Sequence, residues 1–316
     1  MMGEFELIRR FFFPVARGQA KTDVLLGPGD DCAIQKVEKH QELVFSIDTL
    51  VEGVHFPHHY DAEKLGWRSL AVAASDLAAM GANPVCFTLA LTLPEADSAW
   101  LKAFSEGLFR ASQHFDLALA GGDTTRGPLT VTLQVHGTVP AGTALRRSGA
   151  NPGDLICVTG TLGDAGAALE LLDVSSPTSD QASLLEHYHT PNPRLALGQS
   201  LRGFATAAID VSDGLIADLE HLLAASGVGG SIDVDQIPLS ESLRALRPDA
   251  RDLAMHAGDD YELCLTIPES KLAELAQLTG EQLTVIGKVC EGAGLKLEGI
   301  AGLNTLRGYD HFGGPE

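Results

Sequence analysis

Short apolar runs alternate along the chain with stretches in which apolar residues recur every three or four positions. In the first half this pattern predicts strands at 43–47, 85–93, 117–120 and 129–138, with helices at 62–80 and 98–114. In the second half it predicts strands at 155–160, 206–210, 261–267 and 284–289, with helices at 164–172, 214–226 and 269–278. Such alternation is typical of an α/β fold.

The turn-rich stretch from Pro140 to Gly153 separates the two halves. A chain of 316 residues is long for one hydrophobic core. We therefore predict two domains, 1–145 and 146–316, with the second restarting as a strand–turn–helix unit.

The charge limits the partners. The chain has 42 acidic and 22 basic residues, a formal net charge of −20, which disfavours nucleic acids and anionic membranes and repels bare polyphosphates.

The richest apolar stretch is interrupted by Asp76 and Asn83, so no membrane span is expected. The first ten residues do not resemble a signal peptide, and the five cysteines are scattered without a C-x-x-C pair. We expect a soluble protein of the reducing cytoplasm.

Aspartates beside glycine, serine or threonine recur at predicted strand ends. The six segments are 29–31, 46–49, 75–77, 121–125, 210–214 and 258–260. Each alone is typical of an ordinary turn, because Asp and Gly are common turn residues. Because α/β sheets bind ligands at their strand ends, six such segments together predict a shared acidic site.

Asp76 is the most informative of these aspartates. Its helical neighbours Val72, Ala73, Ala79 and Met80 are all apolar, which places its carboxylate on the core-facing side of the predicted helix. An ionised carboxylate there, near the helix C-terminus, needs a cation or hydrogen-bond donors. Mg²⁺ with oxygen ligands meets that need. The alternative is a helix turned by one residue, which would leave Asp76 exposed.

Other sites are less well supported. The chain has neither a P-loop nor the protein-kinase motifs, so a nucleotide here would depend on metal ions to offset its charge. The turn Gly160–Gly166 lacks the G-x-G start of a dinucleotide fingerprint, and a tightly packed helix entry explains it better. His55, His58 and His59 suggest either a zinc site or polar surface.

Seven segments match one known family: Gly3–Ile8, Gly29–Ala33, Ser75–Ala82, Gly121–Gly127, Ser212–Leu215, Asp260–Leu263 and Gly308–Phe312. Through them nearly the whole chain resembles the thiamine-monophosphate kinases, within the superfamily of aminoimidazole ribonucleotide synthetase and selenophosphate synthetase. The resemblance implies a two-domain α/β protein whose N-terminal mixed-sheet domain pairs across a homodimer and binds ATP and Mg²⁺. A second α/β domain would complete the site for thiamine monophosphate.

The resemblance also implies residue roles. The expected Mg²⁺ ligands, direct or through water, are Asp31, Ser46, Ile47, Asp48, Asp76, Asp123, Asp210 and Asp213. The expected ATP contacts are Gly122, Asp123, Arg147 and Ser212, and the expected contacts to thiamine monophosphate are His55, Asp259 and Tyr309. Two positions depart from the family pattern. Ile47 replaces the usual Thr and offers only its carbonyl, and Asp259 is one methylene shorter than the usual Glu.

The chemistry needs no protein nucleophile. The acceptor phosphate is already an anionic oxygen nucleophile, so alignment of two phosphates and neutralisation of their charge suffice. Asp48, Asp76 and Asp123 are the residues on which we expect catalysis to depend. Two alternatives stay open, a sister enzyme of the same superfamily and a non-catalytic divalent-ion-binding protein. ATP binding separates the second alternative from a kinase.

Overall fold

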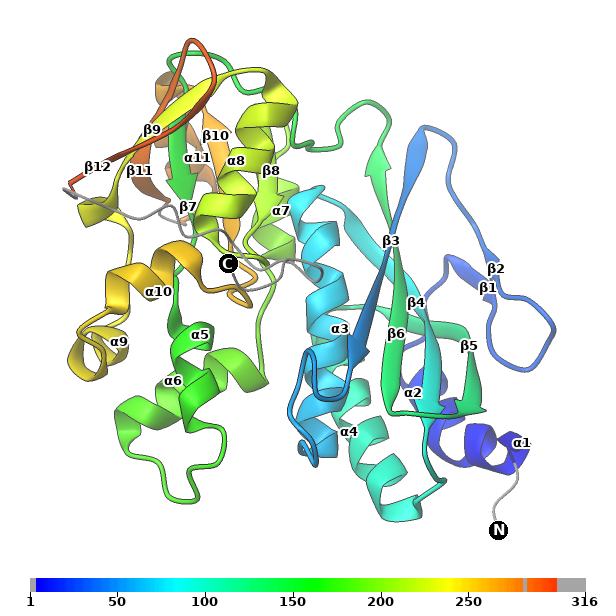
Figure 1. Ribbon diagram of the computed structural model, residues 1–316. Coiled ribbons are helices and arrows are strands. Elements are labelled where there is room, and N and C mark those ends of the chain that lie inside the picture. The colour runs from blue at the N-terminus through cyan, green and yellow to red at the C-terminus, as the bar shows by residue number, and fades with distance from the viewer. Residues whose placement is uncertain (1–3, 281–282, 300–316) are drawn as a thin grey trace. The chain divides into compact units, whose positions relative to one another are not determined.

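The computed structural model describes residues 4–280 and 283–299 and divides into two compact units. Unit 1 comprises Met1–Leu77 and Ala82–Gly142, and unit 2 comprises Ala78–Gly81 and Thr143–Glu316. Each unit has its own sheet and its own helices, so both are α/β (Figure 1). No helix among the described residues has the length and hydropathy needed to span a membrane.

Unit 1 has a four-stranded mixed sheet. Its strands lie in the order β3 (Gln41–Val51), β6 (Thr130–Pro140), β4 (Asn83–Leu93) and β5 (Ala118–Arg126). Strand β6 is antiparallel to both of its neighbours, whereas β4 and β5 are parallel and joined by a helix. Every second residue of β6 is buried, because one face of the sheet forms the core.

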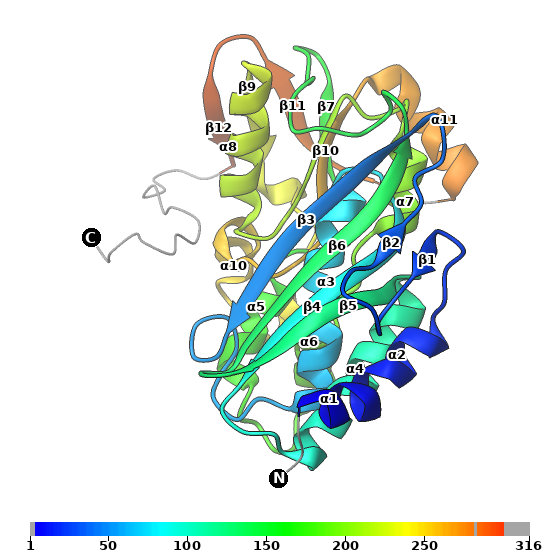
Figure 2. The ribbon, with the colours of Figure 1, turned by 90° about the vertical axis from the view of Figure 1, so that its right-hand side faces the viewer.

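Two long helices cover that face. Figure 2 shows α3 (Ala62–Ala79) and α4 (Ser98–His114) behind the strands. Helix α4 begins where predicted because the Asp97 side chain accepts a hydrogen bond from the Ala99 N–H at 2.8 Å. The shorter elements before β3 are α1 (Glu4–Leu7), the π-helix η1 (Ile8–Phe12), α2 (Phe13–Gly18), β1 (Val24–Leu26) and β2 (Ile34–Gln35).

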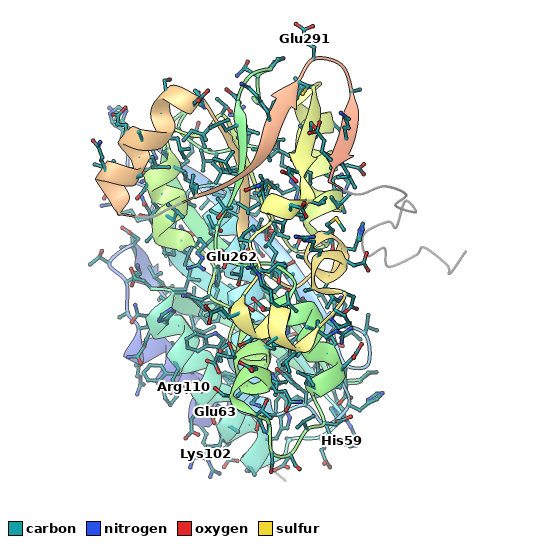
Figure 3. All side chains as sticks on the ribbon, turned by 90° about the vertical axis from the view of Figure 1, so that its left-hand side faces the viewer. His59, Glu63, Lys102, Arg110, Glu262 and Glu291 are labelled. Carbon is teal, nitrogen blue, oxygen red and sulfur yellow. The ribbon has the colours of Figure 1, made fainter. Side chains whose placement is uncertain are left out.

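Glycines allow α3 and α4 to approach closely. A Cβ atom on Gly107 would lie 1.9 Å from the Glu63 carbonyl oxygen, and one on Gly66 would lie 2.2 Å from the Phe104 carbonyl oxygen. The Glu63 carboxylate accepts from Arg110 at 2.7 Å beside this contact (Figure 3). The helix backbones therefore touch directly.

We predict that Gly107→Ala destabilises the protein. Alanine favours a helix interior over glycine by about 1 kcal/mol, but a methyl group 1.9 Å from a backbone oxygen forces the helices apart, an overpacking cost of about 1–3 kcal/mol or more. The free energy of unfolding in urea should fall. Gly27→Ala is the control, because the nearest atom to its added Cβ is 4.0 Å away. Equal stabilities of the two variants would contradict the prediction.

Unit 2 has a six-stranded sheet. The strand order is β12 (Gly294–Glu298), β9 (Gly229–Asp233), β11 (Thr284–Cys290), β7 (Leu155–Val158), β10 (Leu263–Ile267) and β8 (Ala207–Asp210). All neighbours are antiparallel except β12 and β9.

The helices of unit 2 lie on both faces of its sheet. Helix α8 (Leu215–Ser226) covers one face, and α7 (Leu195–Leu201) and α11 (Glu269–Thr279) cover the other (Figure 2). The core contains Ile156, Ile209 and Leu219, all fully buried. The other helices are α5 (Asp164–Ala168), η2 (Leu169–Leu171), α6 (Ser179–His189), η3 (Val234–Gln236), α9 (Glu241–Leu246) and α10 (Ala250–His256).

Three sequence predictions need correction here. The segment 121–125 is not a turn after a short strand, because β5 continues through it to Arg126 in register with β4. Ser46 and Asp48 lie inside β3 and not at its end. The helix expected over 164–172 is a short α-helix followed by a 3₁₀ turn.

Candidate functional site

The predicted residues of β3 fall on opposite faces of the unit 1 sheet. Ser46 and Asp48 pair with Val135 and Leu133 of β6, two buried residues, and so face the core side with α3. Ile47 between them points the other way and is 63% exposed. The Ile47 side chain therefore cannot join its neighbours, and its carbonyl remains its only possible ligand.

Ser46 and Asp76 are brought together. The Ser46 hydroxyl donates a short hydrogen bond to Asp76 Oδ2, across from β3 to α3. Asp76 thus faces the sheet, as its apolar helical neighbours indicated, and it is partly buried. Asp48 lies two residues from Ser46 on the same face, with its Oδ2 buried. The Ser46 hydroxyl and the Asp76 carboxylate, which are in contact, are oxygen ligands of the kind that a hard cation prefers, and so is the Asp48 carboxylate.

A second group lines a pocket of about 640 Å³ in unit 1. One wall is β5 from Gly121 to Thr124, and another is the loop from Gly27 to Ala33. Asp31, Gly122 and Asp123, three of the predicted residues, therefore border one pocket.

Gly122 fits this wall because it has no side chain. A Cβ atom there would lie 2.1 Å from the Leu89 carbonyl oxygen of the paired strand β4. In the loop wall, the Asp31 N–H donates to Oδ1 of the adjacent Asp30 at 2.8 Å.

The pocket also contains residues that sequence reasoning missed. Arg9, Phe12 and Phe13 of the N-terminal helices complete its lining. A cation and aromatic rings beside carboxylates suit a ligand with both anionic and planar parts. The sequence carried no signal for this, because the contact depends on how the N-terminal helices pack.

His55 is fixed at the turn after β3. Its Nδ1 accepts from the Val51 N–H at 3.0 Å, which leaves the proton on Nε2. His58 lies 3.5 Å from a Glu52 oxygen, and the His59 N–H donates to the other oxygen. Among the described residues no three His, Cys, Asp or Glu side chains gather around a common metal position. This finding applies to the predicted zinc site at the turn and equally to the predicted aspartate ligands.

In unit 2, Ser212 and Asp213 lie on the turn between β8 and α8, directly after the buried Asp210. Asp218 Oδ2, from the first turns of α8, accepts from the Ser212 and Asp213 N–H groups at 3.0 and 3.1 Å. Burial is the main cause that raises the pKa of Asp218 to about 7. The negative charge of Asp213 adds to this rise, and the two N–H donors oppose it.

Arg147 belongs to the same neighbourhood. Its positive charge lowers the pKa of the Asp218 carboxyl, as the smallest of the influences on that group. The Arg147 carbonyl accepts from Ser226 Oγ at 3.1 Å, which ties its loop to the end of α8. The assignment of Arg147 and Ser212 to one binding site stays a prediction.

Asp259 lies on a strained turn beside this group. Asp259 and Tyr261 both have positive φ angles, 70° and 52°, which are uncommon for residues other than glycine. The Tyr261 hydroxyl donates to Asp259 Oδ1 at 2.7 Å. The Asp259 N–H donates to the Ser212 carbonyl at 2.9 Å. Strained backbone that is held by several hydrogen bonds is typical of functional sites.

The neighbouring carboxylates of unit 2 are held by donors. Glu262, labelled in Figure 3, accepts two hydrogen bonds from Arg194 at 2.6 and 2.7 Å and one from Thr159 at 2.5 Å. Both oxygens of Asp260 accept from the Gly163 N–H. Gly163 lies at the start of α5, so the glycine-rich turn of the dinucleotide alternative donates its N–H to an internal carboxylate.

The remaining predicted residue, Tyr309, lies outside the described residues.

We predict that Asp260 makes stability depend on pH. Burial raises the pKa of its carboxyl well above the usual value, opposed by the Gly163 N–H and reinforced by the nearby Asp164 and Glu262. The contribution to stability is complete below the unfolded pKa of about 3.9 and is lost as the pH rises through the folded pKa.

The test compares wild type with Asp260→Asn, which stays neutral and keeps an acceptor for the Gly163 N–H. From pH 5 to pH 9 the free energy of unfolding of the wild type should fall relative to that of the variant. Asp173→Asn, at an exposed position, is the control and should show a constant difference. A constant difference for Asp260→Asn as well would show the prediction to be wrong.

Family models match both halves of the chain. The AIR synthase related protein N-terminal domain matches residues 29–139, and the C-terminal domain matches residues 151–300. The thiamine-monophosphate kinase of Salmonella typhimurium is 46% identical over 324 aligned positions, which cover 99% of both chains.

Solved structures agree. The thiamine-monophosphate kinase from Stenotrophomonas maltophilia has a TM-score of 0.86 at 46% identity, covering 92% of this chain and 96% of that one. AaThiL complexed with AMPPCP and TMP has a TM-score of 0.81 at 30% identity, covering 98% and 97%. Both units of the chain are therefore similar to one family of known architecture.

Proposed function

The chain belongs to the thiamine-monophosphate kinases of the AIR synthase-related family, and we propose that it transfers the γ-phosphoryl group of ATP to the phosphate of thiamine monophosphate, giving thiamine diphosphate. One observation carries the proposal. AaThiL, which aligns with 98% of this chain, was solved with AMPPCP, an ATP analogue, together with TMP.

Nucleotide binding is assigned to residues of both units. In unit 1, the pocket between the loop 27–33 and β5 would receive the phosphates at Gly122 and Asp123. In unit 2, Arg147 and Ser212 supply a cation and a hydroxyl, which suit an anionic ligand. Arg9 adds a second cation at the pocket of unit 1.

The donors of the chain suit magnesium. Carboxylate, hydroxyl and carbonyl oxygens are the hard ligands that Mg²⁺ prefers, and the Ser46–Asp76 group is made of them. The proposed ligands are Asp31, Ser46, Ile47 through its carbonyl, Asp48, Asp76, Asp123, Asp210 and Asp213. When bound, Mg²⁺ would neutralise charge on the phosphate oxygens of both substrates.

Acceptor binding is assigned to His55, Asp259 and Tyr309. A hydrogen bond from the Tyr261 hydroxyl orients the Asp259 carboxylate, and one from the Val51 N–H orients the His55 ring. Fixed side chains of this kind favour alignment of the acceptor oxygen with the γ-phosphorus, which a direct in-line transfer requires. The acceptor phosphate is already ionised, so no residue needs to act as a strong general base.

Incubation of the protein with labelled ATP, Mg²⁺ and a panel of phosphorylated acceptors tests the proposal. Label should appear in thiamine diphosphate, and EDTA should abolish both transfer and calorimetrically detected ATP binding. Preference for a purine ribonucleotide acceptor would favour a sister enzyme of the superfamily. Binding of divalent ions without ATP would favour a non-catalytic ion-binding protein.

We predict that Asp48→Asn and Asp76→Asn each lower kcat by about a hundredfold or more, because each removes a charged oxygen ligand while leaving a side chain of the same size. Thermal unfolding should change little. Asp173→Asn, which changes an exposed aspartate, is the control and should keep wild-type kcat. Wild-type rates in both site variants would count against the metal assignment.

A homodimer is also proposed. Edge strand β3 presents Leu43, Phe45 and Ile47 on its outer face, 42%, 62% and 63% exposed. An edge strand with such a row of apolar side chains is suited to pairing with a second copy.

Three of the five free cysteines are buried thiols, which agrees with the reducing cytoplasm that we propose as the location of the protein.

Phe45→Asp should convert this dimer to a monomer, since a carboxylate at the centre of the apolar row cannot be buried without a partner. Size-exclusion chromatography with light scattering measures the mass of each form. Leu278→Asp on α11, another exposed apolar position, is the control and should remain dimeric. A monomeric wild type, or a Phe45→Asp variant of unchanged mass, would contradict the proposal.

A further inference from the structure

The turn that carries Ser212 and Asp213 is fixed by a carboxylate from inside the protein. Asp218 is only 2% exposed, and its Oδ2 accepts from both N–H groups of the turn. The usual helix cap works in the other direction, with a side chain before the helix accepting from its first N–H groups. Here a residue one turn into α8 reaches back to the residues before it.

This arrangement changes what the turn can offer a ligand. The N-terminus of a helix commonly binds phosphate through free backbone N–H groups. The Ser212 and Asp213 N–H groups are committed to Asp218, so their side chains, which are partly exposed, are the parts left for a ligand. The Asp213 carboxylate is a ligand of the kind that a hard cation prefers, and the Ser212 hydroxyl can donate to a phosphate oxygen.

The opposite side of the turn is fixed as well. The Ser212 carbonyl accepts from the Asp259 N–H, and the Val211 carbonyl accepts from the Tyr261 N–H, both at 2.9 Å. A Cβ atom on Gly258 would lie 2.2 Å from the Ser212 carbonyl oxygen. The segment beginning at Gly258 therefore packs directly against the Ser212 carbonyl, and Asp218 accepts from the N–H groups of the same turn. Both sets of contacts restrict rotation of the peptide groups at Ser212 and Asp213.

We propose that Asp218 is a positioning residue for the metal–nucleotide group, one that sets the directions of the Ser212 and Asp213 side chains without touching a ligand itself. The inference rests on the proposed function, which assigns those two residues to ATP and Mg²⁺. Without the acceptor at Asp218 the two N–H groups turn toward water, and the side chains attached to the same backbone turn with them.

A purely stabilising role is the competing explanation. Helix α8 packs on the core through Leu215 and Leu219, so losing a bond at its start lowers stability in either case. Only positioning predicts a loss of metal affinity larger than that caused by an equally buried carboxylate elsewhere. Asp164 of α5 is the matched control, because it is fully buried and accepts from Thr161 and Ser240, neither of which we assign to a ligand.

The experiment measures Mn²⁺ binding by electron paramagnetic resonance in the presence of AMPPCP, together with the Mg²⁺ dependence of kcat, for the whole protein. Asp218→Ala should weaken Mn²⁺ binding about tenfold or more and shift the Mg²⁺ midpoint equally, the usual effect of losing a residue that orients a ligand. Asp218→Asn keeps an acceptor oxygen and should recover most of the affinity. Asp164→Ala, the same substitution at the control position, should bind Mn²⁺ like the wild type.

Asp218→Glu covers the case in which Asp218→Ala does not fold. It keeps the charge but displaces the acceptor by one methylene, so Mn²⁺ affinity should still fall. Wild-type affinity in Asp218→Ala, or in Asp218→Glu where Asp218→Ala is unfolded, overturns the inference. An equal loss in Asp164→Ala also overturns it, by assigning the effect to stability. A wild-type protein that binds no Mn²⁺ with AMPPCP would remove the proposed function and the inference together.

Discussion

A carboxylate taken out of water needs hydrogen-bond donors or cations beside it, and each unit of this chain contains buried or partly buried carboxylates. The described residues supply donors one by one. Ser46 donates to Asp76, Arg194 donates to Glu262, and backbone N–H groups donate to Asp218. Most of these donors are neutral groups that orient a carboxylate without removing its charge.

Much of the fold could be predicted from local patterns. Helix α4 spans the predicted residues because its apolar periodicity is regular and Asp97 marks its start. Strand β9 was missed because Gly229 and Gly230 weaken the strand signal. Gly230 is nevertheless suited to the sheet, since a Cβ there would lie 2.8 Å from Leu223. Helix α6 was missed although its capping box, Thr178 with Gln181, is visible in the sequence.

The candidate site, like the fold, could be predicted from the sequence only in part. The direction of Asp76 followed from its helical neighbours, and its place opposite Ser46 agrees with that direction. The roles of Asp218 and Tyr261 did not follow, because both residues act on positions brought close by the tertiary structure or by a strained backbone. The same holds for Arg9, which reaches the pocket only through the packing of the N-terminal helices. Side-chain direction along one element is local information, whereas contacts between elements are not.

The two walls of the unit 1 pocket differ in the backbone entropy that each would lose when a ligand binds. Gly122 and Asp123 belong to the hydrogen-bonded ladder of β4 and β5, so their backbone entropy has already been lost in folding. Asp31 lies on an exposed loop that retains more of that freedom. A ligand therefore meets one preformed surface and one adaptable surface. Variation in ligand preference among related chains should arise more readily from the composition of the loop than from the strand.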